Sequence, residues 1–543
     1  MTEVIWETTV EVARNEPGGT IGRVVQAVAR GRAGPLFPPL ETVIDEDGTT
    51  QDSEPAGEAA AGFVAAVLRM ERFRPLRDTF ETVAAWCERM AALYRDTVAH
   101  GVLSPDNGHL FGPLVVEAFT ACAADALPDV AKHVATRRHQ YLRSLELFLY
   151  RFSRDAVAGW PADRRFTGTV VHLSVPDGHS HNGGQRLIRV RLDGGGVIAY
   201  RPQPVHGPDR FLAVAEPEEP PASVFDMLNR LPAASGPVRL PTVRSWVGGG
   251  DDADCYSWHE WLGGGPSPAT AVTGPGYWRR AGALTAACGA LGITGWTSER
   301  PGGRHGRYQC MSMGLEHVLR AEAGEVYRMV TAAGWEHGAG PTGAPVRLRR
   351  AGTRWWLIRV PGRMRPLRGP GDIDRHRQLP DFLTGMFDAW TLICREHDRI
   401  ADFLADGPVL LSRVSLRPDV EYRQVLWHRI TTGAEPPNWS PHPAEREQLE
   451  RGDVPYFVAE PGDPDLWALW APPRSSGRIK VSPTIALAGS GGMPSQPRLQ
   501  RLVRLGELLR DAVVAAKQPA ARAGHVLAGM ETLPELSFDR AAT

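Results

Sequence analysis

The sequence predicts an α+β protein in which a helical region, a small antiparallel sheet and a second helical region follow one another. Apolar residues recur at helical spacing in 141–155, β-branched runs broken by glycine fill 166–203, and a helical pattern returns at 276–293. Runs of helices and strands that are separated along the chain are typical of this class. The 543 residues exceed what one hydrophobic core usually covers, so two or more lobes are expected.

The N-terminal half begins with a linker and continues with helices. The stretch EDGTTQDSEPAGEAAAG is polar and acidic, which indicates a mobile linker that closes an N-terminal segment over 1–70. Residues 71–165 predict a helical cap. Within it, four apolar residues recur at i, i+3, i+4 and i+7 and form one stripe: Leu145, Phe148, Leu149 and Phe152.

The rest of the chain divides at changes in this pattern. Residues 166–265 predict the small β-rich lobe, because the DGGG stretch between two strand-like runs is a hairpin signal. Residues 266–435 predict a helical lobe, followed by an extension over 436–520 and a tail over 521–543. Helical patterns in the helical lobe cover 276–293, 381–405 and 419–431.

Charge and cysteine usage exclude several classes of protein. The 61 basic and 62 acidic residues give a net charge of -1, so neither nucleic acid nor an anionic membrane is an expected partner. The six cysteines form no C-x-x-C pair, which indicates buried thiols rather than a disulfide framework or a zinc ribbon. No signal peptide and no run of about 18 apolar residues is present, so a cytoplasmic protein without a membrane span is expected.

Five local strings occur in an order that resembles one enzyme family. They are GHSHNGGQ at 178–185, YRPQ at 200–203, YSWHEW at 256–261, YWRRAG at 277–282 and RGDVPYF at 451–457. Together they resemble motifs of the dehydratase domain of type II lanthipeptide synthetases, the LanM family, over roughly residues 75–475. The resemblance implies a kinase-like two-lobed core, with a small antiparallel β lobe, a helical lobe and an N-terminal helical cap region.

The resemblance also implies an activity. The family's enzymes phosphorylate Ser and Thr of a precursor peptide with ATP and Mg²⁺ and then eliminate the phosphate. Nothing in this chain resembles the zinc ligands of the family's cyclase domain. The chain therefore resembles a stand-alone dehydratase domain, whose expected partners are a precursor peptide and another biosynthetic enzyme of the same pathway.

The residues that bind phosphate in the family are matched only in part by residues of this chain. The family's loop aspartate falls on His179, its histidine falls on His181, and Gly183 and Gly184 are the glycines expected to face a nucleotide. The family's phosphate-binding lysine falls on Arg201. Arginine binds phosphate as a planar fork and does not replace a lysine ammonium without loss, so nucleotide binding is expected to be weakened.

The phosphotransfer residues are mostly replaced. The family's catalytic aspartate aligns with Gly295, and its metal-binding aspartate aligns with Gly314, while Glu299 and Glu316 match. Phosphoryl transfer depends on positioning and on charge neutralisation by Mg²⁺, so we expect ATP-dependent phosphorylation to be lost. The sequence accordingly assigns no cofactor, and binding of ATP with Mg²⁺ stays an open alternative. Glu299 and Glu316 fit helix-cap or ion-pair roles equally well.

For the elimination step, the resemblance points to the string RVSLRPD at 413–419. Arg413 matches the family's arginine, and Asp419 stands where the family has a threonine. A carboxylate at this position can act as a base toward a proton α to a carbonyl. A structural role for Arg413 just before a helix, and simple divergence at Asp419, are the alternatives.

The histidines also allow a metal site. His179 and His181 are two residues apart, which on a strand places both on one face, but no further ligand follows at convincing spacing. The sequence therefore assigns no metal. It favours instead a former phosphate-side loop that is now a surface turn held by Asn182, Gly183 and Gly184.

The favoured interpretation is a pseudo-enzyme in lanthipeptide-like biosynthesis that binds precursor peptide or a partner enzyme. Peptide binding survives the loss of catalytic acids because it depends on shape and backbone hydrogen bonds. The alternative is an active peptide-modifying lyase or transferase that uses His181, Arg201, Arg413 and Asp419. A third possibility is a nucleotide-binding sensor without turnover.

Overall fold

A computed structural model of the chain describes part of its 543 residues. The described residues are 4–7, 69–98, 100–105, 107–124, 126–159, 168–175, 179–203, 206–249, 255–261, 276–293, 302–304, 307–309, 346–351, 354–359, 375–407, 409–417, 419–460, 465, 467–470, 477–480 and 493–515. The predicted linker and tail, Glu299 and Glu316 lie outside these ranges.

The chain forms two compact units, each assembled from segments that are distant in sequence. The first unit comprises 1–202, 341–363 and 415–456, and the second comprises 203–340, 364–414 and 457–543. The segment 415–456 therefore returns to the unit that contains the predicted helical cap and the loop at 178–185.

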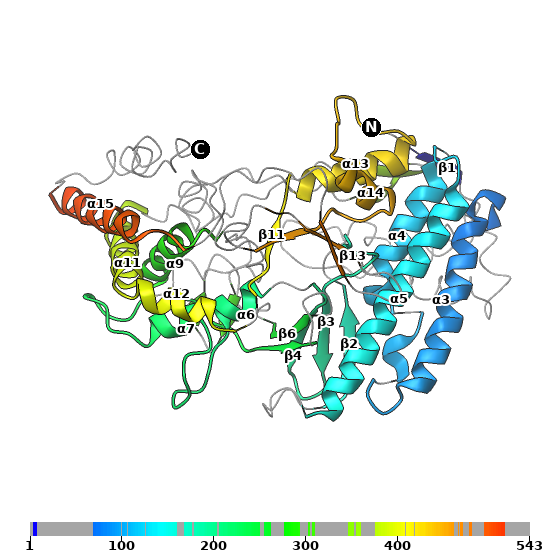
Figure 1. The fold of residues 1–543 in the computed structure, drawn as a ribbon. Coiled ribbons are helices and arrows are strands. Elements are labelled where there is room, and N and C mark those ends of the chain that lie inside the picture. Colours follow the sequence, from blue (N-terminus) through cyan, green and yellow to red (C-terminus); the bar gives the residue numbers. More distant parts are fainter. Residues whose placement is uncertain are drawn as a thin grey trace. The chain divides into compact units, whose positions relative to one another are not determined.

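Three helices form a layer in the first unit. They are α3 (Arg74–Leu93), α4 (Gly108–Ala124) and α5 (Val130–Val157), which lie side by side (Figure 1). Asp129 caps α5 by accepting a hydrogen bond from the amide of Lys132 at 3.2 Å. The predicted apolar stripe of α5 is confirmed, because Leu145, Phe148, Leu149 and Phe152 are all buried.

The first unit also holds short helices and strands around this layer. The strands β2, β3 and β4 form the predicted antiparallel sheet, and the hairpin between β3 and β4 turns at Gly195, whose φ of 82° favours glycine. A second sheet has the order β1-β10-β9. The bounds are η2 (Glu71–Phe73), η3 (His100–Leu103), β1 (Val4–Glu7), β2 (Val170–Ser174), β3 (Ile188–Leu192), β4 (Val197–Arg201), β9 (Val346–Ala351), β10 (Arg354–Arg359), α13 (Asp419–Thr432) and α14 (Pro443–Glu450).

The second unit contains long helices and several short strands. Strands β5 and β6 pair antiparallel, and four further strands pair in the order β11-β12-β13-β14. The bounds are α6 (Gly207–Leu212), α7 (Val224–Asn229), β5 (Ser245–Gly248), β6 (Tyr256–Glu260), α9 (Tyr277–Ala290), β7 (Gly302–Arg304), β8 (Arg307–Gln309), α11 (Arg375–Arg395), α12 (His397–Ala405), β11 (Ser412–Val414), β12 (Phe457–Ala459), β13 (Trp467–Trp470), β14 (Gly477–Lys480) and α15 (Gln496–Ala515).

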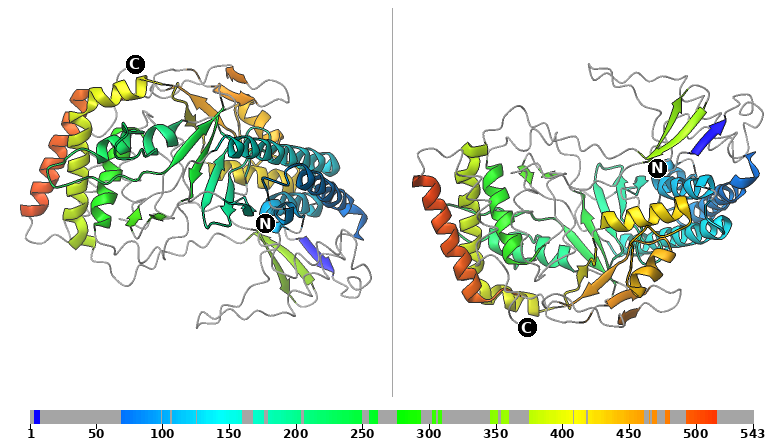
Figure 2. Two further views of the ribbon diagram at one scale, coloured as in Figure 1. Left: turned by 90° about the horizontal axis from the view of Figure 1, so that it is seen from below. Right: turned by 90° about the horizontal axis from the view of Figure 1, so that it is seen from above.

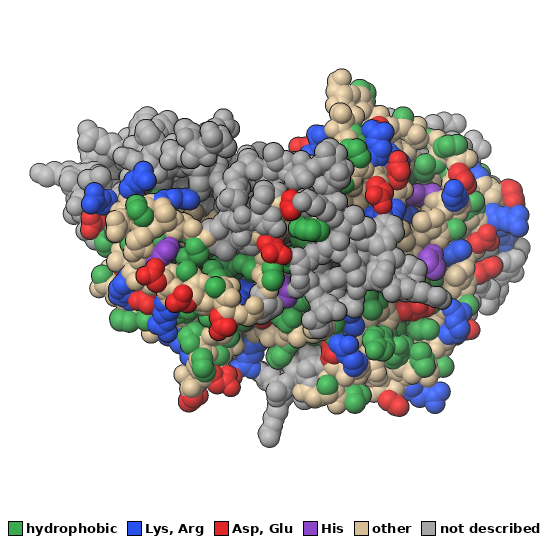
Figure 3. Space-filling view, in the orientation of Figure 1, with side chains coloured by type: hydrophobic (Ala, Val, Ile, Leu, Met, Phe, Trp, Pro, Cys, Tyr) green, Lys and Arg blue, Asp and Glu red, His purple; other side chains and the backbone are tan. Residues whose placement is uncertain are grey.

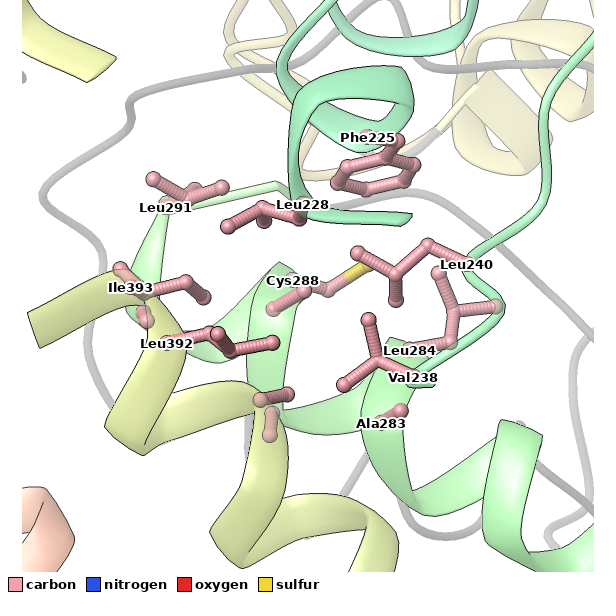
Figure 4. Close-up of a cluster of buried hydrophobic side chains, with 14 of the residues drawn as sticks. Phe225, Leu228, Val238, Leu240, Ala283, Leu284, Cys288, Leu291, Leu392 and Ile393 are labelled. Atoms are coloured by element: carbon pink, nitrogen blue, oxygen red, sulfur yellow. The ribbon is translucent and has the colours of Figure 1, made fainter. Parts of the chain in front are cut away.

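The core of the second unit is apolar. Helix α11 packs between α9 and α15 (Figure 2), and Phe225, Leu284 and Ile393 are among the side chains that meet in the interior (Figure 4). Gly282 of α9 lies against the carbonyl of Phe382, where a Cβ atom would collide with backbone. The helices therefore approach each other through glycine.

The predicted α+β class is confirmed, with helices and small antiparallel sheets in the expected order. One helix differs from its prediction: the pattern at 381–405 is two helices, because the chain leaves helical geometry at Glu396 (φ −97°, ψ 15°) between α11 and α12. Of the described cysteines, Cys394 is only half-buried, while four are buried as expected.

The described surface mixes both signs of charge. Basic and acidic side chains are interspersed on the face in Figure 3, as the balanced composition predicts. Among the described helices, none has the length and apolar character needed to cross a bilayer.

Candidate functional site

The loop that the sequence singled out is a tight, closed turn in the first unit. The amide of His181 donates to the carbonyl of Gln185 at 3.0 Å, and the amide of Gln185 donates back at 2.8 Å. Between them Asn182, Gly183 and Gly184 all have positive φ, at 46°, 79° and 93°. Asparagine and glycine adopt this conformation most readily, so the Asn-Gly-Gly sequence determines the local path of the chain.

This loop is buried, which corrects the expectation of a surface turn. Ser180 is fully buried, and His181 and Asn182 are 6% and 4% exposed. Gly184 explains part of the burial, because a Cβ atom on it would lie 2.8 Å from the Cβ of Gln140 on α5. The loop is thus packed against a helix and shielded from solvent.

A single carboxylate, that of Asp453, holds the loop in place. It accepts hydrogen bonds from the Gly183 amide at 2.7 Å, the Gly184 amide at 3.2 Å and the Ser180 hydroxyl at 2.6 Å. The amide of Val454 also donates to the carbonyl of Ser180 at 2.8 Å. The two glycine amides that were expected to face a nucleotide phosphate therefore bind an anion of the same chain.

A buried ion network surrounds Asp453. The guanidinium of Arg137 bonds to Asp453 at 3.2 Å, to the Ser180 hydroxyl at 2.7 Å and to Glu117 at 2.5 Å, and Arg186 lies 3.5 Å from Glu117. The two positive charges, of Arg137 and Arg186, balance the two negative charges, of Glu117 and Asp453. Burial alone would raise the pKa of both carboxyl groups. The guanidinium of Arg137 offsets this effect and holds the pKa of Glu117 and of Asp453 below the ordinary value.

Two histidines and one aspartate converge beside this network. One ligand-type atom from each of His179, His181 and Asp419 lies within 4.8 Å of the others. Asp419 is the first residue of α13, which belongs to the returning segment 415–456. His181 is buried, while the other two are half-buried, so the cluster borders on solvent.

Backbone and aromatic contacts orient His181. Its Nδ1 lies 2.8 Å from the carbonyl oxygen of Val454. A carbonyl only accepts hydrogen bonds, so Nδ1 carries a proton, and in the neutral ring the lone pair is on Nε2. The ring also packs edge-on against Tyr456 and His179, with centroids 5.0 and 5.1 Å away.

The predicted site residues do not all lie together. In the first unit the structure brings together His181, Gly183, Gly184 and Asp419. Arg201 is buried at the end of β4 in the same unit. Arg413 is buried on β11 and belongs to the second unit.

The sequence analysis missed the residues that hold the loop. Asp453 lies inside the RGDVPYF string, which was recognised only as a resemblance. Arg137 precedes Tyr141 and Leu145 at four-residue spacing on the buried face of α5, and a charged residue on an apolar stripe is a detectable signal. Glu117 gives a comparable signal, because it is the only Asp, Glu, Lys or Arg residue in the apolar helix α4.

No protein-family model and no curated protein matches this chain.

Proposed function

We propose that this chain is a dehydratase-domain-like protein with a kinase-like core that acts in the maturation of a ribosomally made, lanthipeptide-like peptide. In this role it binds the precursor peptide or a partner enzyme and does not phosphorylate Ser or Thr with ATP. The five ordered strings in the sequence support the family resemblance, and the succession of helices, small antiparallel sheet and helices is consistent with it.

The observation that carries the proposal is the occupation of the glycine loop by Asp453. A nucleotide phosphate at the amides of Gly183 and Gly184 would have to displace this carboxylate or lie beside it. Two like unit charges about 4 Å apart repel by about 4 kcal/mol at an effective dielectric constant of about 20. A nucleotide phosphate at these amides is therefore disfavoured while Asp453 occupies the loop. Because Asp453 lies in a string that resembles the family's own, the proposed loss of phosphorylation also depends on the glycines at positions 295 and 314.

A second function is favoured by the convergence of His181 with Asp419. Both residues are predicted members of an altered active site, and a neutral imidazole beside a carboxylate can abstract a proton α to a carbonyl. The chain would then be a lyase or transferase that modifies a peptide without ATP. Arg201 would be its phosphate-binding or carboxylate-binding residue.

The test of the proposed function begins with nucleotide binding. We expect ATP with Mg²⁺ to leave the melting temperature of the wild type and of Arg201→Ala unchanged, because a ligand that binds only the native state must raise it. A rise in the wild type that disappears in Arg201→Ala would overturn the loss of nucleotide binding.

The second step uses synthetic peptides encoded by short reading frames beside the gene. We expect one of them to bind in fluorescence anisotropy and to keep its mass after incubation with the protein, ATP and Mg²⁺. A peptide that gains phosphate would refute the proposal. A peptide that loses water without ATP would establish the second function instead.

A further inference from the structure

We infer that His179, His181 and Asp419 form a binding site for a divalent transition-metal ion, of the class of Zn²⁺ or Fe²⁺. The sequence assigned no metal because only the two histidines were visible as a pair. The returning segment supplies a third donor, Asp419, from the start of α13. The inference does not depend on the proposed function.

The donor atoms are close enough for one ion. Zinc binds imidazole nitrogen at about 2.0–2.1 Å and carboxylate oxygen at about 2.0–2.2 Å, which places tetrahedral donors about 3.4 Å apart. The three donors here lie within 4.8 Å of one another, so torsional adjustments of the side chains suffice to bring them to bonding distance. Two of the three side chains, those of His179 and Asp419, are half-buried rather than enclosed.

The contacts of His181 are those of a metal ligand. Histidines that bind metals usually donate their second ring N–H to a carbonyl or carboxylate, which selects the tautomer and fixes the ring. The Nδ1 of His181 makes this contact with the carbonyl of Val454 and thereby makes Nε2 the donor atom. Since Asp453 binds the Ser180 hydroxyl and the Gly183 amide, which flank His181, the histidine is positioned before any ion arrives.

The donor set selects the class of ion. Two imidazoles and one carboxylate suit Zn²⁺ and Fe²⁺, whereas Mg²⁺ prefers a shell of oxygen atoms. Three protein donors leave at least one coordination position for water or substrate. His179 and Asp419 are half-buried, so the site borders on solvent and a water molecule or an added ligand can reach the ion.

The test measures Zn²⁺ binding to the full chain after metal removal with a chelator. We expect one ion per chain in competition titrations against a zinc-sensitive dye. The half-buried ligands allow variants with little risk to folding, and we expect His179→Ala and Asp419→Asn each to weaken binding more than about tenfold, the smallest effect typical of even outer contacts. Co²⁺ should give the d–d absorption of a nitrogen- and oxygen-bound ion, and both variants should lose it.

Matched controls separate this site from adventitious binding by other histidines and carboxylates. His139→Ala changes an exposed histidine on α5, and Glu421→Gln changes an exposed carboxylate on α13. Both are expected to bind Zn²⁺ like the wild type. The inference is overturned if the wild type binds no Zn²⁺, or if His179→Ala and Asp419→Asn bind it as tightly as the two controls.

Discussion

Two buried contacts, one in each unit, depend on different kinds of side chain. In the second unit, α9 and α11 meet mainly through apolar side chains and glycine, in a core that contains Leu284 and Cys288. One ion pair, Arg279–Asp388 at 2.7 Å, also joins the two helices. In the first unit, two buried charged side chains, Asp453 and Arg137, hold the loop at 179–185 in place. An apolar core tolerates many sequences of similar volume, whereas a buried ion network requires each partner. The polar network of the first unit thus fixes the position of the loop at 179–185.

The largest effect is expected from breaking the ion network. Asp453→Ala leaves the buried guanidinium of Arg137 without one partner and removes the acceptor of two glycine amides. Removing one partner of a buried ion pair lowers the free energy of unfolding by about 3–5 kcal/mol. Hydrogen exchange should show faster opening of the amides in 179–185, while Glu450→Ala, an exposed carboxylate change on α14, should leave them as in the wild type.

A cavity in the apolar core should lower the amide protection of the second unit and leave that of the first unit unchanged. Leu284→Ala removes a buried side chain from α9, and such truncations cost about 2–5 kcal/mol. We expect the amides of α9 and α11 to exchange faster while those in 179–185 keep their protection. Val409→Ala is the matched control, because Val409 is exposed in the same unit. Equal loss of protection in both regions would show that the two interiors are not independent.

Acid should weaken the first unit before the second. The folded-state pKa values of Glu117 and Asp453 are lowered, so their contribution to stability is present above the ordinary carboxyl pKa and is lost as the pH falls through the lower folded-state values. We therefore expect the protection of 179–185, corrected for intrinsic exchange, to decline as the pH falls below about 4. Protection of α9 amides should decline less. A decline of equal size in α9 would contradict the assignment.

The smallest effect is expected from the glycines of the loop. Gly183→Ala forces alanine into positive φ, which costs about 1–2 kcal/mol, and a Cβ atom there meets nothing within 4 Å. Gly184→Ala adds a clash with Gln140 on α5 and should cost more. Urea denaturation gives the free energy of unfolding of each variant, and hydrogen exchange gives the protection of the amides in 179–185. Together these measurements rank the two substitutions by their effect. A larger effect at Gly183 would show that the packing against α5 is unimportant.

Periodicity predicted much of the fold. The stripe on α5, the β3–β4 hairpin and the helices at 277–290 and 419–432 follow from local spacing, because amphipathic repeats and turn residues depend on near neighbours. The break at Glu396 was missed, since the apolar repeat continues through it. Local pattern therefore predicts the type of an element better than its ends.

The candidate site was predictable only in pieces. His181, Gly183, Gly184 and Asp419 were selected individually through a resemblance, and no local signal joins Asp419 to the histidines. Arg137 was recognisable only as a charge on an apolar stripe. The partner of such a charge cannot be read from the sequence, because buried ions pair according to spatial proximity.

By itself, the sequence determined the α+β class, the turn at Asn182–Gly184 and the apolar stripe of α5, because backbone preferences and periodicity act over a few residues. The tertiary structure decided that residues 415–456 return to the first unit. Only that return brings Asp453 to the glycine amides and Asp419 to the two histidines. Contacts between such distant segments arise from the packing of whole elements, which no local pattern encodes.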